Sequence, residues 1–280
     1  MIKITCLVDN CVLSGSSMWG EHGVSFLIET INGKVLFDCG QSGDVLLHNA
    51  AQLKKSLDEI DFLVISHAHY DHTGGMEKLC LQRNQPIPLI AHTDLFRHRF
   101  SKRENEFRAI DIDFENPNIR GKIIWQLSKE PKEILPDIWT SGEIKIRNDF
   151  EGRSKYHMIQ ENGVWKPDPY LDDMSMVIKG EKSLMLICGC CHAGLLNTLA
   201  VVRDIFDMDI AMILGGTHLI TANPEMIGLV VDKIKTLNAD GRLPGLYLNH
   251  CTGESALQIL REKLGECVHA CPAGTIIEFK

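Results

Sequence analysis

Short apolar runs and segments with helically spaced apolar residues alternate along most of the chain. The short runs predict strands at residues 2–8, 24–29, 34–38, 61–66, 184–188, 210–214, 245–249 and 275–279. Apolar residues at helical spacing predict helices at 44–57, 194–206, 224–237 and 254–264. Because an apolar sheet face needs a cover, strands interleaved with helices predict an α/β (α+β) fold in which helices sandwich the sheets.

Residues 95–170 break this regular alternation. The segment is charged and is interrupted by Asn116-Pro117, Glu130-Pro131 and Asp168-Pro169. We interpret it as a central insertion that covers the active site as a lid, with simple surface decoration as the alternative. The 280 residues contain no Pro/Gly/Ser-rich linker and no short repeat, so we expect a single domain over 1–280.

One motif concentrates metal-binding side chains directly after the apolar run 62–65: His67-Ala68-His69-Tyr70-Asp71-His72. Alternate residues of an extended segment point the same way, so His67 and His69 can share one ion. Asp71 and His72, at the start of the next turn, can reach a second ion. Imidazole and carboxylate ligands suit zinc, and also iron or manganese. A solvated, turn-capping cluster is the alternative, and the clustering favours the metal site.

Two more histidines repeat the same placement. His192 follows the apolar run 184–188, and His250 follows the run 245–249. Because neighbouring strands that end at one sheet edge bring their following residues together, we predict that both bind metal beside the first motif. His218 also follows an apolar run, through Gly215-Gly216, and for it a role as part of the scaffold is a close alternative.

These motifs resemble the metallo-β-lactamase superfamily and, within it, the group of dihydropterin ribofuranosyl-aminobenzene phosphate synthases. The resemblance is carried by residues 21–29, 36–42, 67–72, 188–194, 215–219 and 250–253. It implies an αββα sandwich with the metals at one edge of the sheets. It also implies that His218 faces the site without binding metal, where it would protonate a leaving group or hold an anionic oxygen.

The chain departs from the best-known members of that superfamily at two places. Cys190 stands after Gly189 where an aspartate usually bridges two ions, and Asp172-Asp173 stand where a third histidine is expected. Either Cys190 bridges as a thiolate, or Asp172 or Asp173 supplies an oxygen ligand. Asp38, at the end of an earlier strand, is expected to hydrogen-bond a ligand histidine. Turn capping is the alternative for Asp38.

Charge and cysteine usage restrict the partners and the compartment. The formal net charge of −8 argues against nucleic acid, which requires a basic surface. The basic run 97–103 is either a solvated surface or a local binding site for an anionic substrate. We find no signal peptide and no membrane-spanning stretch, and the ten cysteines are expected to stay reduced, which favours a cytoplasmic protein. The sequence leaves the oligomeric state open.

These observations predict a metal-dependent hydrolase, or a related transferase, that uses a metal-activated water. One or two divalent ions are expected, zinc first and then iron or manganese, with Asp71 as both a ligand and the residue that orients the nucleophile. The resemblance implies a small anionic substrate that is phosphorylated or pterin-like. Three rival functions are a di-iron redox enzyme, a non-catalytic metal-bound sensor and an RNA-processing enzyme.

Overall fold

Two seven-stranded β-sheets form the centre of the protein. The computed structural model describes residues 1–104, 106–145, 147 and 151–280. The first sheet has the order β18-β1-β2-β3-β4-β5-β8 and the second the order β17-β16-β15-β14-β13-β10-β9. The strands of the first sheet are β1 (Ile2–Val8), β2 (Ser25–Thr30), β3 (Gly33–Phe37), β4 (Phe62–Val64), β5 (Ile87–Ala91), β8 (Ile123–Leu127) and β18 (Ile276–Phe279). Those of the second are β9 (Lys132–Leu135), β10 (Ile138–Thr140), β13 (Ser175–Lys179), β14 (Leu184–Cys188), β15 (Ile210–Gly215), β16 (Gly245–Leu248) and β17 (Val268–Ala270).

The sheets pack face to face because their strands are apolar on both sides. Phe26 pairs with Phe37 across β2 and β3, and both side chains enter the core between the sheets, where Ile187 of the second sheet also lies. The next pair along, Leu27 and Leu36, points to the opposite face and joins a separate core under the helices. This alternation follows from the two-residue period of a strand.

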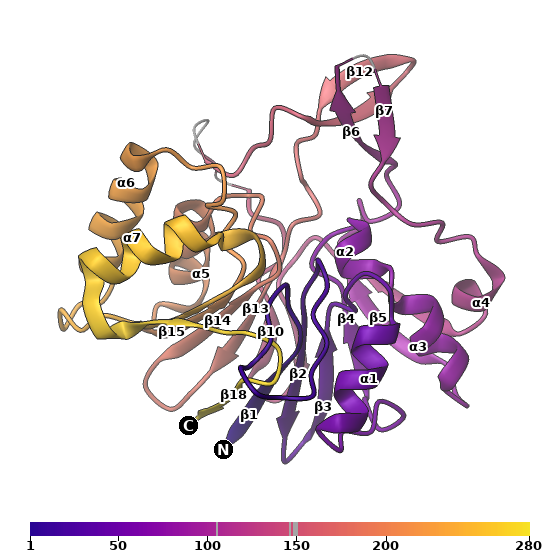
Figure 1. Ribbon diagram of the computed structural model, residues 1–280, viewed down its shortest axis with the longest axis horizontal. Helices are drawn as coiled ribbons and strands as arrows, with labels where there is room; N and C mark the ends of the chain where they lie inside the picture. The colour runs from indigo at the N-terminus through magenta and orange to yellow at the C-terminus, as the bar shows by residue number, and fades with distance from the viewer. Residues whose placement is uncertain (105, 146, 148–150) are drawn as a thin grey trace.

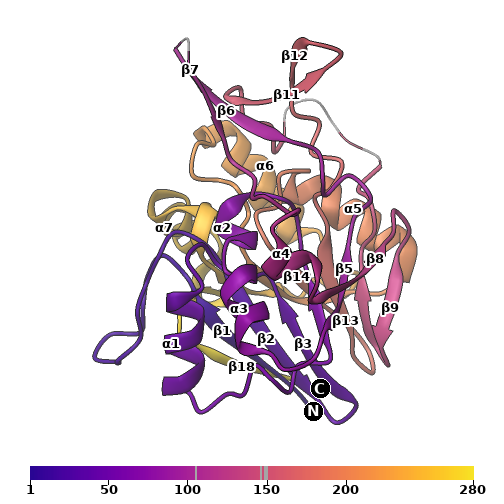
Figure 2. The same ribbon diagram turned by 90° about the vertical axis from the view of Figure 1, so that its right-hand side faces the viewer.

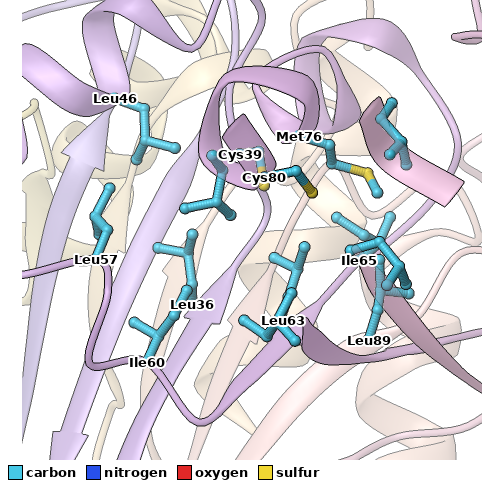
Figure 3. Packing of buried hydrophobic residues seen from close by; sticks show 14 of the residues in the cluster. Leu36, Cys39, Leu46, Leu57, Ile60, Leu63, Ile65, Met76, Cys80 and Leu89 are labelled. Atoms are coloured by element: carbon cyan, nitrogen blue, oxygen red, sulfur yellow. The ribbon is translucent and has the colours of Figure 1, made fainter. Parts of the chain in front are cut away.

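Helices cover the two outer faces (Figure 1). The first sheet is covered by α1 (Asp44–Gln52), α2 (Tyr70–Thr73), α3 (Met76–Gln82) and α4 (Pro117–Arg120), and the second by α5 (Leu195–Phe206), α6 (Pro224–Lys235) and α7 (Glu254–Leu264). Figure 3 shows Leu46 of α1 and Met76 of α3 above Leu36 and Leu63 of the first sheet. The predicted αββα sandwich is therefore confirmed. No helix among the described residues is long and apolar enough to cross a membrane.

The helix predicted at 44–57 is shorter than expected. It ends at Gln52, and Lys54 adopts a left-handed backbone conformation (φ 55°) that a helix cannot continue. Leu57 is nevertheless buried, because the chain after the helix returns to the same core. The apolar side chain of Leu57 therefore indicated a buried position and not a helical one.

Residues 95–170 do interrupt the alternation of strands and helices, but they are not without secondary structure, because the segment contains the strands β6–β12. Three of these belong to the two large sheets. The other four form a separate small sheet of order β12-β11-β6-β7, which stands beyond the ends of the large sheets (Figures 1 and 2). Its strands are β6 (Arg99–Arg103), β7 (Glu106–Ala109), β11 (His157–Glu161) and β12 (Val164–Pro167). Stacking of Phe107 on Trp165, with ring centroids 3.7 Å apart, packs its outer strands together.

Candidate metal centre

Histidines from both large sheets meet at the carboxyl ends of their strands. His67 follows β4, and His69 directly precedes α2. On the second sheet, His192 follows β14 and His250 follows β16. Each of the four side chains is buried. Since β14, β15 and β16 run parallel, their carboxyl ends lie at one edge, which explains how residues far apart in the sequence share this place.

Three imidazoles form what we call the three-histidine group: His67, His69 and His192. One nitrogen atom of each lies within 4.8 Å of the nitrogen atoms of the other two. His69 has an extended backbone (φ −62°, ψ 145°), so it and His67 lie on the same side of the chain, as the two-residue spacing predicts. The ring of His192 lies 4.8 Å from each of the other two rings.

A second set of side chains, the four-ligand group, adjoins the first and consists of Asp71, His72, Cys190 and His250. One potential ligand atom of each lies within 4.8 Å of the others. Cys190 Sγ is 3.3 Å from His72 Nε2, and Asp71 Oδ2 is 3.3 Å from His250 Nε2. The ring centroids of His67 and His72 are 4.1 Å apart, so the two groups are neighbours.

The donor atoms of the three-histidine group fit a metal ion. Among the described residues, His67 Nε2, His69 Nε2 and both ring nitrogens of His192 are buried without a hydrogen-bond partner. Orphaned buried nitrogens are costly unless something satisfies them. Burial, together with the charges of neighbouring groups, mainly other histidines, lowers the pKa of each of the three well below the ordinary value. They are therefore neutral at neutral pH, which is the form that binds metal.

Charge in the four-ligand group is distributed differently. Burial disfavours the charged forms of both His72 and Asp71, but their mutual attraction outweighs it. The carboxylates of Asp71 and Asp38 raise the pKa of His72 to about 9, while His72 and His250 hold the pKa of Asp71 below its ordinary value. The proton on His72 thus places a positive charge between the carboxylates of Asp71 and Asp38. A divalent cation would supply the same charge.

Close packing behind the histidines depends on Gly189. Asp38 Oδ1 accepts a hydrogen bond from the Ser66 amide at 2.7 Å, and its Oδ2 accepts another from Ser66 Oγ, also at 2.7 Å. A Cβ at Gly189 would lie 2.2 Å from Ser66 Oγ and 2.9 Å from Asp38 Oδ2. The glycine before Cys190 is therefore required by the carboxylate network beneath the site.

Asp172 and Asp173 accept hydrogen bonds from backbone amides next to the histidines of the three-histidine group. Asp172 accepts from the Ala68 amide at 2.9 Å, and Asp173 accepts from the Ala193 amide at 2.7 Å. Neither carboxylate belongs to a group of potential ligand atoms among the described residues. Burial raises the pKa of Asp172 to about 7 and that of Asp173 to about 6. Asp172 also contacts the buried guanidinium of Arg99 at 2.7 Å, which ties the small sheet to the histidine motif.

His218 lies beside the three-histidine group and belongs to neither ligand group. Its ring meets that of His192 edge-on at 4.3 Å, and its backbone is left-handed (φ 51°). Its amide donates to Cys251 Sγ at 3.3 Å. Burial, followed by the charge of His157, lowers the pKa of His218 to about 4. This partly buried imidazole is therefore neutral at neutral pH and lines a cavity beside the ligand groups.

Both groups open on one cavity of about 880 Å³, a volume suited to a small molecule. Its lining includes His157 of β11, which sequence reasoning missed. The ring of His157 is 5.0 Å from that of His69, and its Nδ1 is 2.8 Å from the hydroxyl of Tyr170. Tyr170 in turn stacks on His192 with centroids 4.5 Å apart. A lone histidine in a charged segment carries no sequence signal that would have identified it.

Comparisons with known proteins agree with this geometry. Residues 18–189 match the family model of the metallo-β-lactamase superfamily. The chain is 31% identical to 7,8-dihydropterin-6-methyl-4-(β-D-ribofuranosyl)-aminobenzene-5'-phosphate synthase of Methanocaldococcus jannaschii, over 99% of this chain and 97% of that protein. An uncharacterised protein of the same organism is 30% identical over 94% of each chain. A crystal structure described as a metal-dependent hydrolase of the β-lactamase superfamily superposes with a TM-score of 0.85, at 26% identity and 100% coverage of both chains.

Proposed function

Because the chain belongs to the metallo-β-lactamase superfamily, we propose that it is a metal-dependent hydrolase of an ester bond in a phosphorylated small molecule. The observation that carries this proposal is the pair of adjoining ligand groups at one cavity, with buried imidazole nitrogens that have no partner among the described residues. A site with several neutral imidazoles, a carboxylate and a thiol is typical of transition metals.

In this proposal the three-histidine group would hold one ion and the four-ligand group a second. Nitrogen and sulfur donors favour zinc, with iron or manganese as alternatives. When bound, such ions lower the pKa of water and stabilise negative charge on the attacked group. The likeness to a synthase named for a ribofuranosyl phosphate supports a phosphorylated substrate and equally a transferase, in which another nucleophile replaces water at the same site.

The protein's own side chains would orient the reactants. Asp71 Oδ2 lies 3.3 Å from His22 Nε2 and 3.3 Å from His250 Nε2, and it faces the cavity, so it can accept a hydrogen bond from an attacking water and orient it. The neutral imidazole of His218 would hold the leaving oxygen by donating an N–H hydrogen bond to it. The water oxygen then bonds to the attacked atom, the ester bond breaks, and a proton passes to the leaving oxygen.

The small sheet has a place in this proposal as a cover over the reactants. Residues of β6 and β7 and residues 153–157 line the same cavity as the ligand groups. Arg99 at the base of the sheet is fully buried and joins it to Asp172 behind the histidine motif. Water would then be limited near the reacting bond.

The test uses the protein as isolated, with its metal content measured by elemental analysis. Bis(p-nitrophenyl) phosphate, p-nitrophenyl phosphate and p-nitrophenyl acetate are offered in turn. We expect turnover of at least one phosphate ester, its loss on chelation of the metal, and a large decrease in Asp71→Asn. Asp240→Asn, at an exposed ion pair, is the matched control. If metal-loaded protein turns over none of the three esters, the hydrolase proposal is wrong.

A further inference from the structure

One wall of the cavity carries basic side chains from the small sheet and from the segment before β11. Arg103 of β6, Arg108 of β7 and Lys155 line it, and we call these three residues the basic wall. Arg153 lines the cavity as well. Among the described lining residues outside the ligand groups, Glu106 is the one carboxylate. A concentration of cations on one wall contrasts with the net charge of −8 for the whole chain.

The register of the small sheet explains why these side chains share one face. His157 of β11 pairs with Ser101 of β6, and Ser101 pairs with Arg108 of β7. Arg103 lies two residues after Ser101, so its side chain points to the same side of β6. All four of these residues line the cavity. They form a row that leads from the metal centre, where the His157 ring is 5.0 Å from that of His69, to the basic wall.

The row crosses the small sheet from β11 to β7. Neighbouring strands lie about 4.8 Å apart, so the backbone of Arg108 is about 10 Å from that of His157. The basic side chains belong to the small sheet and its flanking segment, whereas the ligand groups lie at the ends of the large sheets, so the two sets face the cavity from different elements. A molecule with a sugar and a ring between its reacting bond and its phosphate can contact both sets.

The basic wall forms no ion pair with the described carboxylates, although Glu106 of β7 stands opposite Arg103 of β6 in the strand pairing. Arg103, Arg108 and Lys155 make no ion pair with a carboxylate of the described residues, whereas Arg97 and Arg99 of the same basic run pair with Asp94. Lys155 rests over the ring of Tyr156, with its Nζ 5.0 Å from the centroid. Within the run 97–103, Arg97 and Arg99 therefore form ion pairs inside the protein, whereas Arg103 lines the cavity.

We propose that the basic wall is a second anion-binding subsite, which holds a terminal phosphate monoester of the substrate apart from the bond that reacts. The proposal deepens the proposed function, because it takes the ligand of this subsite to be the substrate of the metal centre. Arginine presents paired N–H groups that match phosphate oxygens, and a lysine adds a third cation for a dianion. The substrate class is an extended sugar phosphate and not a free inorganic ion.

The test is a calorimetric titration of the metal-loaded protein with ribose 5-phosphate and, separately, with ribose. We expect the Kd for ribose 5-phosphate to rise by about 10- to 100-fold in Arg103→Gln and in Arg108→Gln, since each change removes a charge-assisted contact. Lys155→Gln should act in the same direction, and ribose should bind far more weakly than its phosphate. Arg242→Gln, at an exposed arginine outside the cavity, should leave the Kd unchanged.

Two results would overturn the subsite. In the first, the basic-wall variants bind ribose 5-phosphate like the wild type, and a chelator abolishes binding, so that the metal centre alone holds the phosphate. In the second, a short single-stranded oligonucleotide binds more tightly than ribose 5-phosphate and the variants lose it, which identifies a surface for phosphodiester chains. Equal melting temperatures would exclude misfolding of the variants. Failure of the hydrolase proposal would appear separately, as absent turnover of chromogenic esters by the wild type.

Discussion

Nδ1 of His72 lies 2.7 Å from Oδ2 of Asp38, and both side chains are completely buried. The contact fixes the orientation of the imidazole, so that its Nε2 faces Asp71 at 3.5 Å and Cys190 at 3.3 Å. Asp38 itself is held by the amide and hydroxyl of Ser66. A carboxylate behind a ligand histidine sets both the position and the basicity of the ring.

Asp38→Asn should therefore weaken metal binding by about 10- to 100-fold, as is usual when such a partner is lost. Asparagine keeps the size of the side chain and tolerates the left-handed backbone at this position (φ 61°). Affinity would be measured by competition with a chromophoric chelator. Asp240→Asn serves as the control, and an unchanged affinity in Asp38→Asn would show that His72 needs no orienting partner.

Cys190 should act as a thiolate ligand. Replacement of the native metal by cobalt should produce the near-ultraviolet charge-transfer absorption of a cobalt–thiolate bond, because the thiolate is the form of cysteine that binds metal. Cys190→Ser should remove this band. Cys191→Ser is the matched control, since its Sγ contacts Thr198 Oγ1 at 3.4 Å and lies outside both ligand groups. A band that persists in Cys190→Ser would assign the sulfur to another residue.

His218→Ala should lower turnover by about 10²- to 10³-fold on an ester with a poor leaving group, the usual contribution of a hydrogen-bond donor that stabilises a developing oxyanion. The loss should shrink for p-nitrophenol, which leaves without a proton. Metal content should stay the same. His269→Ala, on an exposed ring stacked against Tyr247, is the control. Loss of metal from His218→Ala would make His218 a ligand, and full activity on the poor leaving group would make it part of the scaffold.

The metal-free protein should lose stability as the pH falls from 6.5 towards 4. The three-histidine group and His218 have pKa values lowered by burial, so they contribute stability above pH 6.5 that is lost as the unfolded state takes up protons. Asp172 and Asp173 act in the opposite direction, because their pKa values in the folded state are raised to about 7 and 6. Their contribution to the free energy of unfolding is fully present below the pKa of an unfolded aspartate and is lost as the pH rises through the raised values. His22, His92 and His157 also have lowered pKa values and Asp9 has a raised one, so seven such histidines outnumber three such carboxyl groups. Each unbalanced proton is worth about 1.4 kcal/mol per pH unit.

The measurement for this prediction is the free energy of unfolding of chelated protein in urea at several pH values. In Asp173→Asn the loss on acidification should be steeper, because the opposing contribution of that carboxyl group is removed. Asparagine can still accept the hydrogen bond from Ala193. A rise in stability between pH 6.5 and pH 5 would contradict the assignment of neutral, buried imidazoles.

The apolar patterns of the sequence determined that helices sandwich the sheets and placed the histidines at strand ends, while the αββα layering was implied by the resemblance to the superfamily. Apolar runs predict buried strands because burial is a local property of each residue, and the two-residue period places His67 and His69 on one side. The helix at 254–264 was predicted with the bounds found for α7. The metal roles of these histidines remain predictions.

Only the tertiary structure decided which of these side chains share an ion and which groups support them. Cys190 and His72 are separated by 118 positions in the chain, and the pairing of Arg99 with Asp172 depends on strands that no apolar pattern marks. The small sheet escaped prediction because most side chains of β6 and β7 are exposed on both faces, so burial left no periodic signal. Its position over the cavity comes from strand pairing between distant segments, which local propensity does not encode.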